Sequence, residues 1–316
     1  MRRVIIDTDT AGDDTTAILM ALHHFKVEGI TIASGNVEFN QQVENALVTV
    51  ETFDPQEKVP VFKGHESPMI SLPLKKHLTV EEIQGGNGMG DAVFPKPNQV
   101  AEDEHAVDFM IRTIKENPGE IEIIALAPLT NIAMAIKRDP TILADIKHIW
   151  IMGGINNALG NVAAVAEYNF YVDPEAARIV LHSGVPQTLV TWDASLDYGV
   201  IYDDDIAIIE ALDTKGSKFF LDVNLFVKAF EFAKRGVDGI TCTDSLLAAV
   251  AADESIVLKA TDYYVDIETG GNLTRGFNLV DRENELGQAP NIRIIENIDS
   301  DKFKAMLGDM LADINN

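Results

Sequence analysis

The sequence predicts an α/β fold: an open, mostly parallel, doubly wound sheet with helices on both faces, in a single domain spanning residues 1–316. Apolar, β-branched runs alternate with segments of helical spacing along the chain. The strand-like runs are apolar throughout, as expected for strands that are covered on both faces. No repeat, low-complexity tract or linker divides the chain, and 46% of its 316 residues are hydrophobic, which is ample for a large core.

Six runs are interpreted as strands because apolar, β-branched residues dominate them and a loop follows each one. With those loops included, they cover residues 3–7, 29–36, 59–64, 120–131, 148–154 and 186–195. Five segments between them carry apolar residues at helical spacing. These helices are expected at residues 15–25, 42–53, 106–117, 131–140 and 173–184.

Two segments depart from this alternation. We expect a glycine- and proline-rich lid loop near residues 74–99 and a mostly helical insertion near residues 199–240. In parallel sheets, ligands bind beyond the carboxyl ends of the strands, where the loops gather. Polar and glycine residues fall at several such ends, namely Asp7 to Asp14, Asn36, Thr130, Asn131, Gly153, Gly154 and Asp193. Their convergence predicts a site at this edge of the sheet.

The charge balance narrows the classes of partner. The chain has 50 acidic and 25 basic residues, a formal net charge of −25 at pH 7. Such a surface repels phosphate backbones and anionic lipids, so neither nucleic-acid nor membrane partners are expected. No apolar run approaches the roughly 20 residues that span a bilayer.

Cys242 is the single cysteine, which rules out an internal disulfide and a cysteine metal cluster. A strand-like run begins by residue 4 and leaves no room for a signal peptide, so a cytoplasmic protein is expected.

Four aspartates lie within eight residues at the first strand end: Asp7, Asp9, Asp13 and Asp14. Helix capping accounts for one or two of them, because a carboxylate at a helix start accepts backbone N–H bonds. It does not account for all four, since like charges about 4 Å apart repel by roughly 1 kcal/mol even in water. A bound cation relieves this repulsion. Oxygen ligands suit a hard ion, so the cluster predicts binding of Ca²⁺ or Mg²⁺.

The same segment is compatible with a different enzyme class. "DTDT" resembles the first four positions of the strand-end Asp-x-Asp-x-Thr of haloacid dehalogenase-like phosphotransferases, in which Asp7 would be the nucleophile and Asp9 the acid/base. That fold also needs a later lysine and a distal acidic pair, which short patterns do not exclude. It does not require the adjacent Gly12, Asp13 and Asp14, and these residues remain unexplained by this alternative.

The wider chain resembles the nucleoside hydrolases, the inosine–uridine-preferring family and its relatives. "DTDTAGDD" at residues 7–14 is similar to the Asp-x-Asp-Pro-Gly-x-Asp-Asp opening of that family, with Thr10 and Ala11 in place of Pro-Gly. Further matches follow in the family's order over nearly the whole chain: "ASGN" at 33–36, "APLTNIA" at 127–133, "IMGG" at 151–154, "GNVAAVAEYN" at 160–169, "DPEAA" at 173–177, "TDSLLAA" at 243–249 and "LTRGFNLVD" at 273–281. The resemblance implies Ca²⁺-dependent hydrolysis of ribonucleosides to ribose and free base. A homodimer or homotetramer is expected.

The resemblance also implies roles by position. Asp9 would bind Ca²⁺ and act as general base on a metal-bound water, and Asp7 would support the loop and that water. The other implied metal ligands are Asp14, Asp244 and the backbone carbonyl of Thr130. The groups implied around the ribose are Asp13, Asn36 and Asn169 at the 2′- and 3′-hydroxyls, Asn161 and Glu167 near the 5′-hydroxyl, and Met152 close to the sugar. Breaking an N-ribosidic bond builds an oxocarbenium-like cation, which carboxylates and directed hydrogen bonds stabilise.

The sequence departs from the family where the leaving base would be activated. Thr243 stands where relatives of the inosine–uridine type carry a histidine before the last metal aspartate, and Gln84 replaces the histidine of the family's His-Gly loop. A threonine hydroxyl is a poor acid near neutral pH. The candidate substitutes are Glu231, Arg235 and, on the expected lid, His77. The first two fit a solvated helix face equally well.

Without that histidine we expect purine ribonucleosides to be preferred, because purines accept a proton at N7 and uridine has no equally basic ring site. Trp192, directly before Asp193, is either a core residue or a ring that faces the base. A nonhydrolytic ribonucleoside-binding protein, whose turnover was lost with the histidine, is the third function that the sequence leaves open.

Overall fold

The computed structural model describes residues 1–71, 80–157 and 159–315. Its large sheet consists of strands β1 (Arg3–Thr8), β2 (Lys26–Ile32), β3 (Val61–Lys63), β4 (Ile121–Ala125), β5 (His148–Met152), β6 (Gln187–Val190), β9 (Val257–Ile267), β10 (Asn278–Asp281) and β11 (Ile292–Ile298). A separate antiparallel pair is formed by β7 (Val200–Tyr202) and β8 (Gly239–Thr241).

The helices connect these strands. The α-helices are α1 (Asp13–His24), α2 (Phe39–Phe53), α3 (Val80–Gln84), α4 (Ala106–Glu116), α5 (Thr130–Arg138), α6 (Tyr168–Val172), α7 (Pro174–Leu181), α8 (Trp192–Tyr198), α9 (Asp203–Ala211), α10 (Lys215–Arg235), α11 (Asp244–Ala252) and α12 (Ser300–Asp313). Two short 3₁₀ helices are η1 (Pro140–Ala144) and η2 (Glu254–Ile256). In the part of the chain that the structure describes, no helix is both long and apolar enough to cross a membrane.

The sheet has the strand order β10-β9-β11-β6-β5-β4-β1-β2-β3. Neighbours from β11 to β3 pair in parallel, whereas β9 and β10, at one edge, pair antiparallel. The predicted open, mostly parallel sheet in a single domain is therefore confirmed. Parallel pairing brings the carboxyl ends of β1, β2, β4, β5 and β6 to one edge of the sheet, where ligands bind in folds of this kind.

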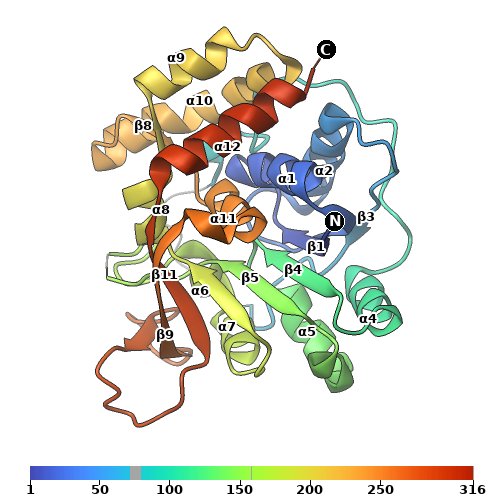
Figure 1. Ribbon diagram of the computed structural model, residues 1–316. Helices are drawn as coiled ribbons and strands as arrows, with labels where there is room; N and C mark the ends of the chain where they lie inside the picture. The colour runs from blue at the N-terminus through green and yellow to red at the C-terminus, as the bar shows by residue number, and fades with distance from the viewer. Residues whose placement is uncertain (72–79, 158, 316) are drawn as a thin grey trace.

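Side chains along each central strand alternate between two apolar cores, one on each face of the sheet. Val4 and Ile6 of β1 belong to one core and Ile5 to the other, and Ile124 and Ile123 of β4 alternate in the same way. Figure 1 shows α1, α2, α11 and α12 over one face and α4, α5 and α7 over the other. The two helical layers explain why these strands are apolar throughout, and they confirm the predicted doubly wound arrangement.

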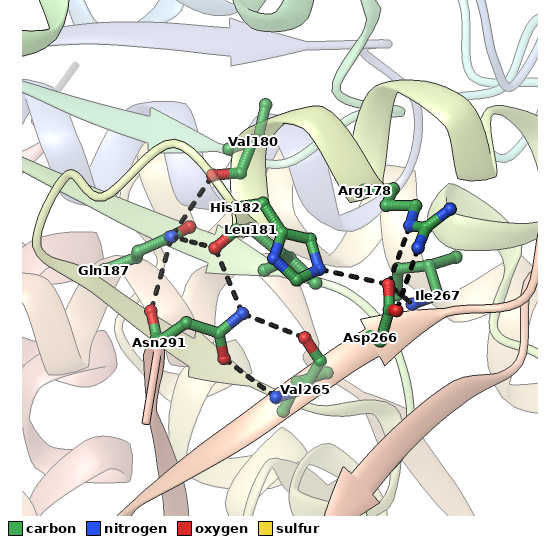
Figure 2. Close-up of polar contacts among 9 residues, drawn as sticks. All are labelled: Arg178, Val180, Leu181, His182, Gln187, Val265, Asp266, Ile267 and Asn291. Carbon is green, nitrogen blue, oxygen red and sulfur yellow. Dashed lines mark hydrogen bonds and ion pairs between the residues drawn. The ribbon is translucent and has the colours of Figure 1, made fainter. Parts of the chain in front are cut away.

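The C-terminal strands and α12 were not among the predicted elements. Figure 2 shows how β9 and β11 are fixed to the end of α7. The Asn291 side chain donates to the carbonyls of Leu181 (3.2 Å) and Val265 (2.9 Å), and its oxygen accepts from the Val265 N–H at 2.8 Å. Asp266 of β9 accepts two bonds from Arg178, at 2.8 and 3.0 Å. This edge is therefore held by side chains as well as by the β-ladder.

Of the two segments that depart from the alternation, the structure describes residues 199–240 in full and the expected lid only from residue 80. Residues 199–240 form β7, α9, α10 and β8. Within the expected lid near 74–99, residues 74–79 lie outside the described residues, and His77 with them. Helix α3 and the glycine-rich turn after it are described, and the Gly12 N–H donates to the carbonyl of Gly88 at 2.6 Å. The turn after α3 is thus tied directly to the aspartate-rich loop.

Candidate active site

A cavity of about 130 Å³ lies at the carboxyl edge of the sheet. Twelve of the residues with a predicted role in the site line it: Asp9, Asp13, Asp14, Asn36, Met152, Asn161, Glu167, Asn169, Trp192, Glu231, Arg235 and Asp244. Asp7 and Thr130 do not line it, although both are buried. The fold thus brings together side chains from both ends of the chain, and their individual roles stay predictions.

The loop after β1 turns directly into α1, so the helix begins two residues earlier than predicted. Gly12 has φ +44°, a left-handed conformation that favours glycine. Asp14, in the first turn of α1, accepts hydrogen bonds from the Thr8 hydroxyl (2.5 Å), the Ala11 N–H (3.2 Å) and the Asn36 side chain (3.2 Å). One carboxylate therefore fixes the β1 loop and the β2 loop to each other.

Asp13 joins the N-termini of two helices that are far apart in sequence. Its Oδ2 accepts from the backbone N–H groups of Asp244 (2.7 Å) and Ser245 (3.1 Å), and its Oδ1 accepts from the Ser245 hydroxyl at 2.8 Å. These N–H groups belong to the first turn of α11, where a carboxylate is favoured by the helix dipole. The capping role expected for an aspartate is real, but Asp13 caps α11 rather than its own helix.

Asp9 is a buried carboxylate on the cavity wall with one oxygen that lacks a partner among the described residues. It is 1% exposed, and its Oδ2 has no hydrogen-bond partner among the described residues. The Asn36 side chain donates to the Asp9 backbone carbonyl at 3.2 Å and so holds the loop in place. The backbone of Gly35 approaches closely: a methyl group at that position would lie 1.8 Å from Asp9 Oδ2. Gly35 leaves the room that this carboxylate occupies.

Burial and mutual repulsion disfavour the charged forms of these acids in the protein alone. Burial, followed by the charge of Asp14, raises the pKa of Asp9, and burial, followed by the charges of Asp14 and Asp13, raises the pKa of Asp244. Burial also raises the pKa of Asp13, and it raises the pKa of Asp14 to about 7 although Thr8 and Ala11 stabilise the anion. A bound cation would reverse this effect, because its charge favours the ionised forms.

Glu167 and Asn169 form the wall beside β5. Glu167 caps α6, since it accepts from the N–H groups of Asn169 (2.8 Å) and Phe170 (3.3 Å), and it also accepts from the Gly154 N–H at 2.8 Å. Burial raises the pKa of Glu167 to about 7 in spite of these bonds. The Asn169 amide donates to the carbonyls of Leu126 (2.8 Å) and Met152 (3.2 Å). Asn161 Oδ1, by contrast, is buried with no partner among the described residues.

Asp7 and Thr130 support the site from behind. Asp7 Oδ1 accepts from the Thr31 hydroxyl (2.6 Å) and the Asn131 amide (2.9 Å), and burial raises the pKa of Asp7 to about 7. The Thr130 hydroxyl donates to Asp173 at 2.6 Å. Because Asp7 is fully buried and does not line the cavity, it is poorly placed to be the nucleophile of a phosphotransferase.

The remaining wall comes largely from helix α10 and the strand before α11. The cavity is also lined by Asn224, Val227 and Thr241, which were not predicted from the sequence. The signal was present for two of them: Asn224 and Val227 lie seven and four residues before Glu231, on the same face of a helix. Gln84 and Thr243, identified by their departure from the family, line the cavity as well.

The clustered carboxylates are the type of ligand that a hard cation prefers, but the structure does not place them around a common point. Among the described residues, no group of three or more acidic, histidine or cysteine side chains is placed to hold a metal ion. Asp13 and Asp14 instead direct both oxygens to hydrogen-bond donors. The buried, partnerless Asp9 Oδ2 and the raised pKa values around it are what a cation would relieve. Calcium binding therefore stays a prediction.

Comparison with known proteins identifies the class. The family model described as "Inosine-uridine preferring nucleoside hydrolase" matches residues 4–305. The chain belongs to this family, and it is a ribonucleoside hydrolase.

Individual relatives are similar to this chain over nearly its full length. The chain is 32% identical over 311 residues to an uncharacterised protein of Schizosaccharomyces pombe, covering 96% of this chain and 97% of that one. It is 31% identical over 304 residues to the pyrimidine-specific ribonucleoside hydrolase RihB of Escherichia coli, covering 96% and 94%. The solved purine-preferring ribonucleoside hydrolase from Gardnerella vaginalis superposes with a TM-score of 0.90 at 31% identity, covering 99% of each chain. Neither the phosphotransferase nor the nonhydrolytic alternative gains support from these similarities.

Proposed function

We propose that the protein hydrolyses the N-glycosidic bond of ribonucleosides, purine ribonucleosides preferentially, to ribose and free base in a Ca²⁺-dependent reaction. The observation that carries this proposal is the buried Asp9 carboxylate on the cavity wall, with an oxygen that lacks a partner among the described residues. A carboxylate in that state is suited to accept a proton or to bind a cation.

The ligands proposed for Ca²⁺ are Asp9, Asp14, Asp244 and the Thr130 carbonyl. When bound there, Ca²⁺ would neutralise the clustered negative charge and make a water molecule more acidic. Asp9 takes a proton from the attacking water, whose oxygen forms the new bond to C1′ of the ribose as the bond from C1′ to the base nitrogen breaks. The departing base keeps the electron pair of that bond and acquires a proton.

The ribose is proposed to lie between the α1 and α6 walls of the cavity. Asp13, Asn36 and Asn169 would hold its 2′- and 3′-hydroxyls, and Asn161 and Glu167 its 5′ end. The buried, partnerless Asn161 Oδ1 supports this arrangement, because a sugar hydroxyl would supply the missing donor. Buried carboxylates near C1′ also stabilise the positive charge that develops on the sugar in the transition state.

The preference for purines rests on the residue at position 243. Thr243 lines the cavity but offers no effective acid, so a base that can accept a proton from solvent at N7 has the advantage. The relatives do not decide the matter, since similar identities connect this chain to a purine-preferring and to a pyrimidine-specific enzyme.

The proposal is tested with a panel of inosine, adenosine, guanosine, uridine and cytidine, assayed before and after EDTA treatment and after Ca²⁺ is restored. We expect base release from purine nucleosides, loss with EDTA and recovery with Ca²⁺. The variant Asp9→Ala should fold but lose at least about a thousandfold in kcat. A preference for uridine or cytidine, full activity in EDTA, or a mostly active Asp9→Ala enzyme would each contradict the corresponding part.

A further inference from the structure

Helix α10 presents one face to the cavity. Asn224, Val227, Glu231 and Arg235 all line it, and their spacing of three, four and four residues places them along a single stripe of the helix. Gly236, with φ +70°, ends the helix immediately after Arg235. The two charged residues of this stripe therefore sit on the last turns of a helix whose end is fixed.

Glu231 is a buried carboxylate with one free oxygen. Its side chain is 4% exposed, its Oε1 is paired with the Arg235 guanidinium, and its Oε2 is buried with no hydrogen-bond partner among the described residues. A buried acceptor without a donor is costly, and the cost is removed when a ligand supplies an N–H or O–H. Because Oε1 is paired with a guanidinium, Oε2 is left to accept a hydrogen bond from a ligand.

Arg235 is fixed on its other side by Trp192. The guanidinium carbon lies 4.8 Å from the centre of the Trp192 ring, a cation–π distance. The stacked guanidinium occupies Oε1 of Glu231 and leaves Oε2 available. Trp192, left open between a core residue and a ring facing the base, thus acts as the platform for Arg235 and is also part of the cavity wall.

We propose that Glu231 is a specificity-determining residue that accepts a hydrogen bond from a ring N–H of the leaving base. Its site would favour purines with a proton on N1, the 6-oxopurines, over purines that present an N1 lone pair. This inference rests on the proposed function, because it needs the base to lie at the α10 side of the cavity.

The other free polar atoms at this side do not fix the polarity of the ligand. Gln84 Oε1 and the Thr241 hydroxyl are also buried without partners among the described residues. A primary amide can turn to present its nitrogen, and a hydroxyl can donate or accept. The carboxylate of Glu231 has no such freedom. A ring N–H of the base can donate to Oε2 of Glu231. Adenine bound in the same position would instead present its N1 lone pair to the carboxylate, and both groups would lose water without gaining a hydrogen bond.

The isosteric variant Glu231→Gln tests this assignment. We expect kcat/KM for inosine and guanosine to fall about ten- to a hundredfold, while adenosine and purine riboside change by less than about threefold or improve. For each nucleoside, the ratio of kcat/KM in the variant to kcat/KM in the wild type is compared, because the intrinsic reactivity of the leaving base cancels in this ratio. Wild-type enzyme should also prefer inosine to adenosine. The matched control is Glu116→Gln, which removes an exposed pair with Arg112 of the same i,i+4 spacing on α4, outside the cavity lining.

Thermal unfolding of both variants establishes that they are folded. An equal loss of kcat/KM for inosine and adenosine would overturn the proposal, because it would assign Glu231 to a step common to all purines. No loss for either substrate would overturn it as well. Failure of wild-type enzyme to release any base would instead refute the proposed function itself. The two failures are therefore distinguishable.

Discussion

Glu122 is a buried acid at the opposite end of the sheet from the cavity, and its replacement tests the electrostatics of the fold. The residue lies on β4 and is 1% exposed. Its carboxylate accepts hydrogen bonds from the Arg2 guanidinium (Nε at 2.9 Å), from Lys147 at 2.9 Å and from the Trp150 indole at 2.8 Å. We expect Glu122→Gln to destabilise the protein without impairing the catalytic site.

The magnitude follows from the pKa of Glu122. Burial alone would raise it, but the bonds from Arg2, Trp150 and Lys147 outweigh burial and lower it from 4.5 to about 2. Each tenfold change in the acid constant corresponds to about 1.4 kcal/mol, so the ionised carboxylate contributes about 3 kcal/mol at pH 7. Because the pKa of the folded state is lowered, this stabilisation is fully present above pH 4.5 and is lost as the pH falls from about 4.5 to about 2.

Urea unfolding followed by far-ultraviolet circular dichroism measures this contribution. At pH 7, Glu122→Gln should lower the free energy of unfolding by about 3 kcal/mol, and the difference from wild type should shrink as the pH falls below about 4.5. The control Glu120→Gln removes a 61% exposed partner of Arg3 and should cost less than about 1 kcal/mol. Equal costs for the two variants, or a difference that does not depend on pH, would refute the reasoning.

Two further predictions concern the cavity. Gly35→Ala places a methyl group 1.8 Å from Asp9 Oδ2, so the carboxylate must move and kcat/KM should fall about a hundredfold. The control Gly308→Ala adds a methyl group that meets nothing within 4 Å and should leave kcat/KM unchanged. Steady-state kinetics and thermal melts of both variants check this prediction, and an unimpaired Gly35→Ala enzyme would contradict it. If buried groups such as Asp13 and Asn169 hold the ribose hydroxyls, 2′-deoxyadenosine should be at least about a thousandfold poorer than adenosine in kcat/KM, and equal values would count decisively against that arrangement.

Local sequence was sufficient for most of the elements that surround the cavity. Apolar runs identified the first six strands, which are mostly buried, and helical spacing of apolar residues identified α1, α2, α4, α5 and α7. The short helices α3 and α6, which lie between the same strands, were not predicted. Apolar periodicity failed for β9, which alternates irregularly between exposed and buried residues and therefore gives no clear period. The edge formed by β9 and β10 depends on contacts such as Asn291 with Val265, and these only exist once distant segments have met.

Most of the residues that line the cavity were predictable from the sequence, but the hydrogen bonds that connect them were not. A run of aspartates at a strand end predicts a polar site, and the order of motifs extends that prediction to Asn169 and Asp244. Neither observation indicates that Asp13 caps α11, because its partners are more than 230 residues away. The pairing of Glu231 with Arg235 was visible as an i,i+4 spacing, but burial of its second oxygen depends on how α10 packs over the cavity.

The two ends of the sheet treat buried acids in opposite ways, and the contrast bears on the need for a cation. At the amino end, Glu122 is surrounded by Arg2 and Lys147, which lie next to it in space, and its pKa is lowered to about 2. At the carboxyl end, Asp14 and Glu167 keep hydrogen-bond donors but gain no cationic partner among the described residues, and burial raises the pKa of each to about 7. Arg235 is the one cationic side chain among the described residues that line the cavity, and it is bound to Glu231. The protein thus pairs its buried acid with cations at the amino end of the sheet, whereas the described acids at the carboxyl end have no free cationic partner. This arrangement is expected where positive charge arrives with a metal ion or develops on a substrate.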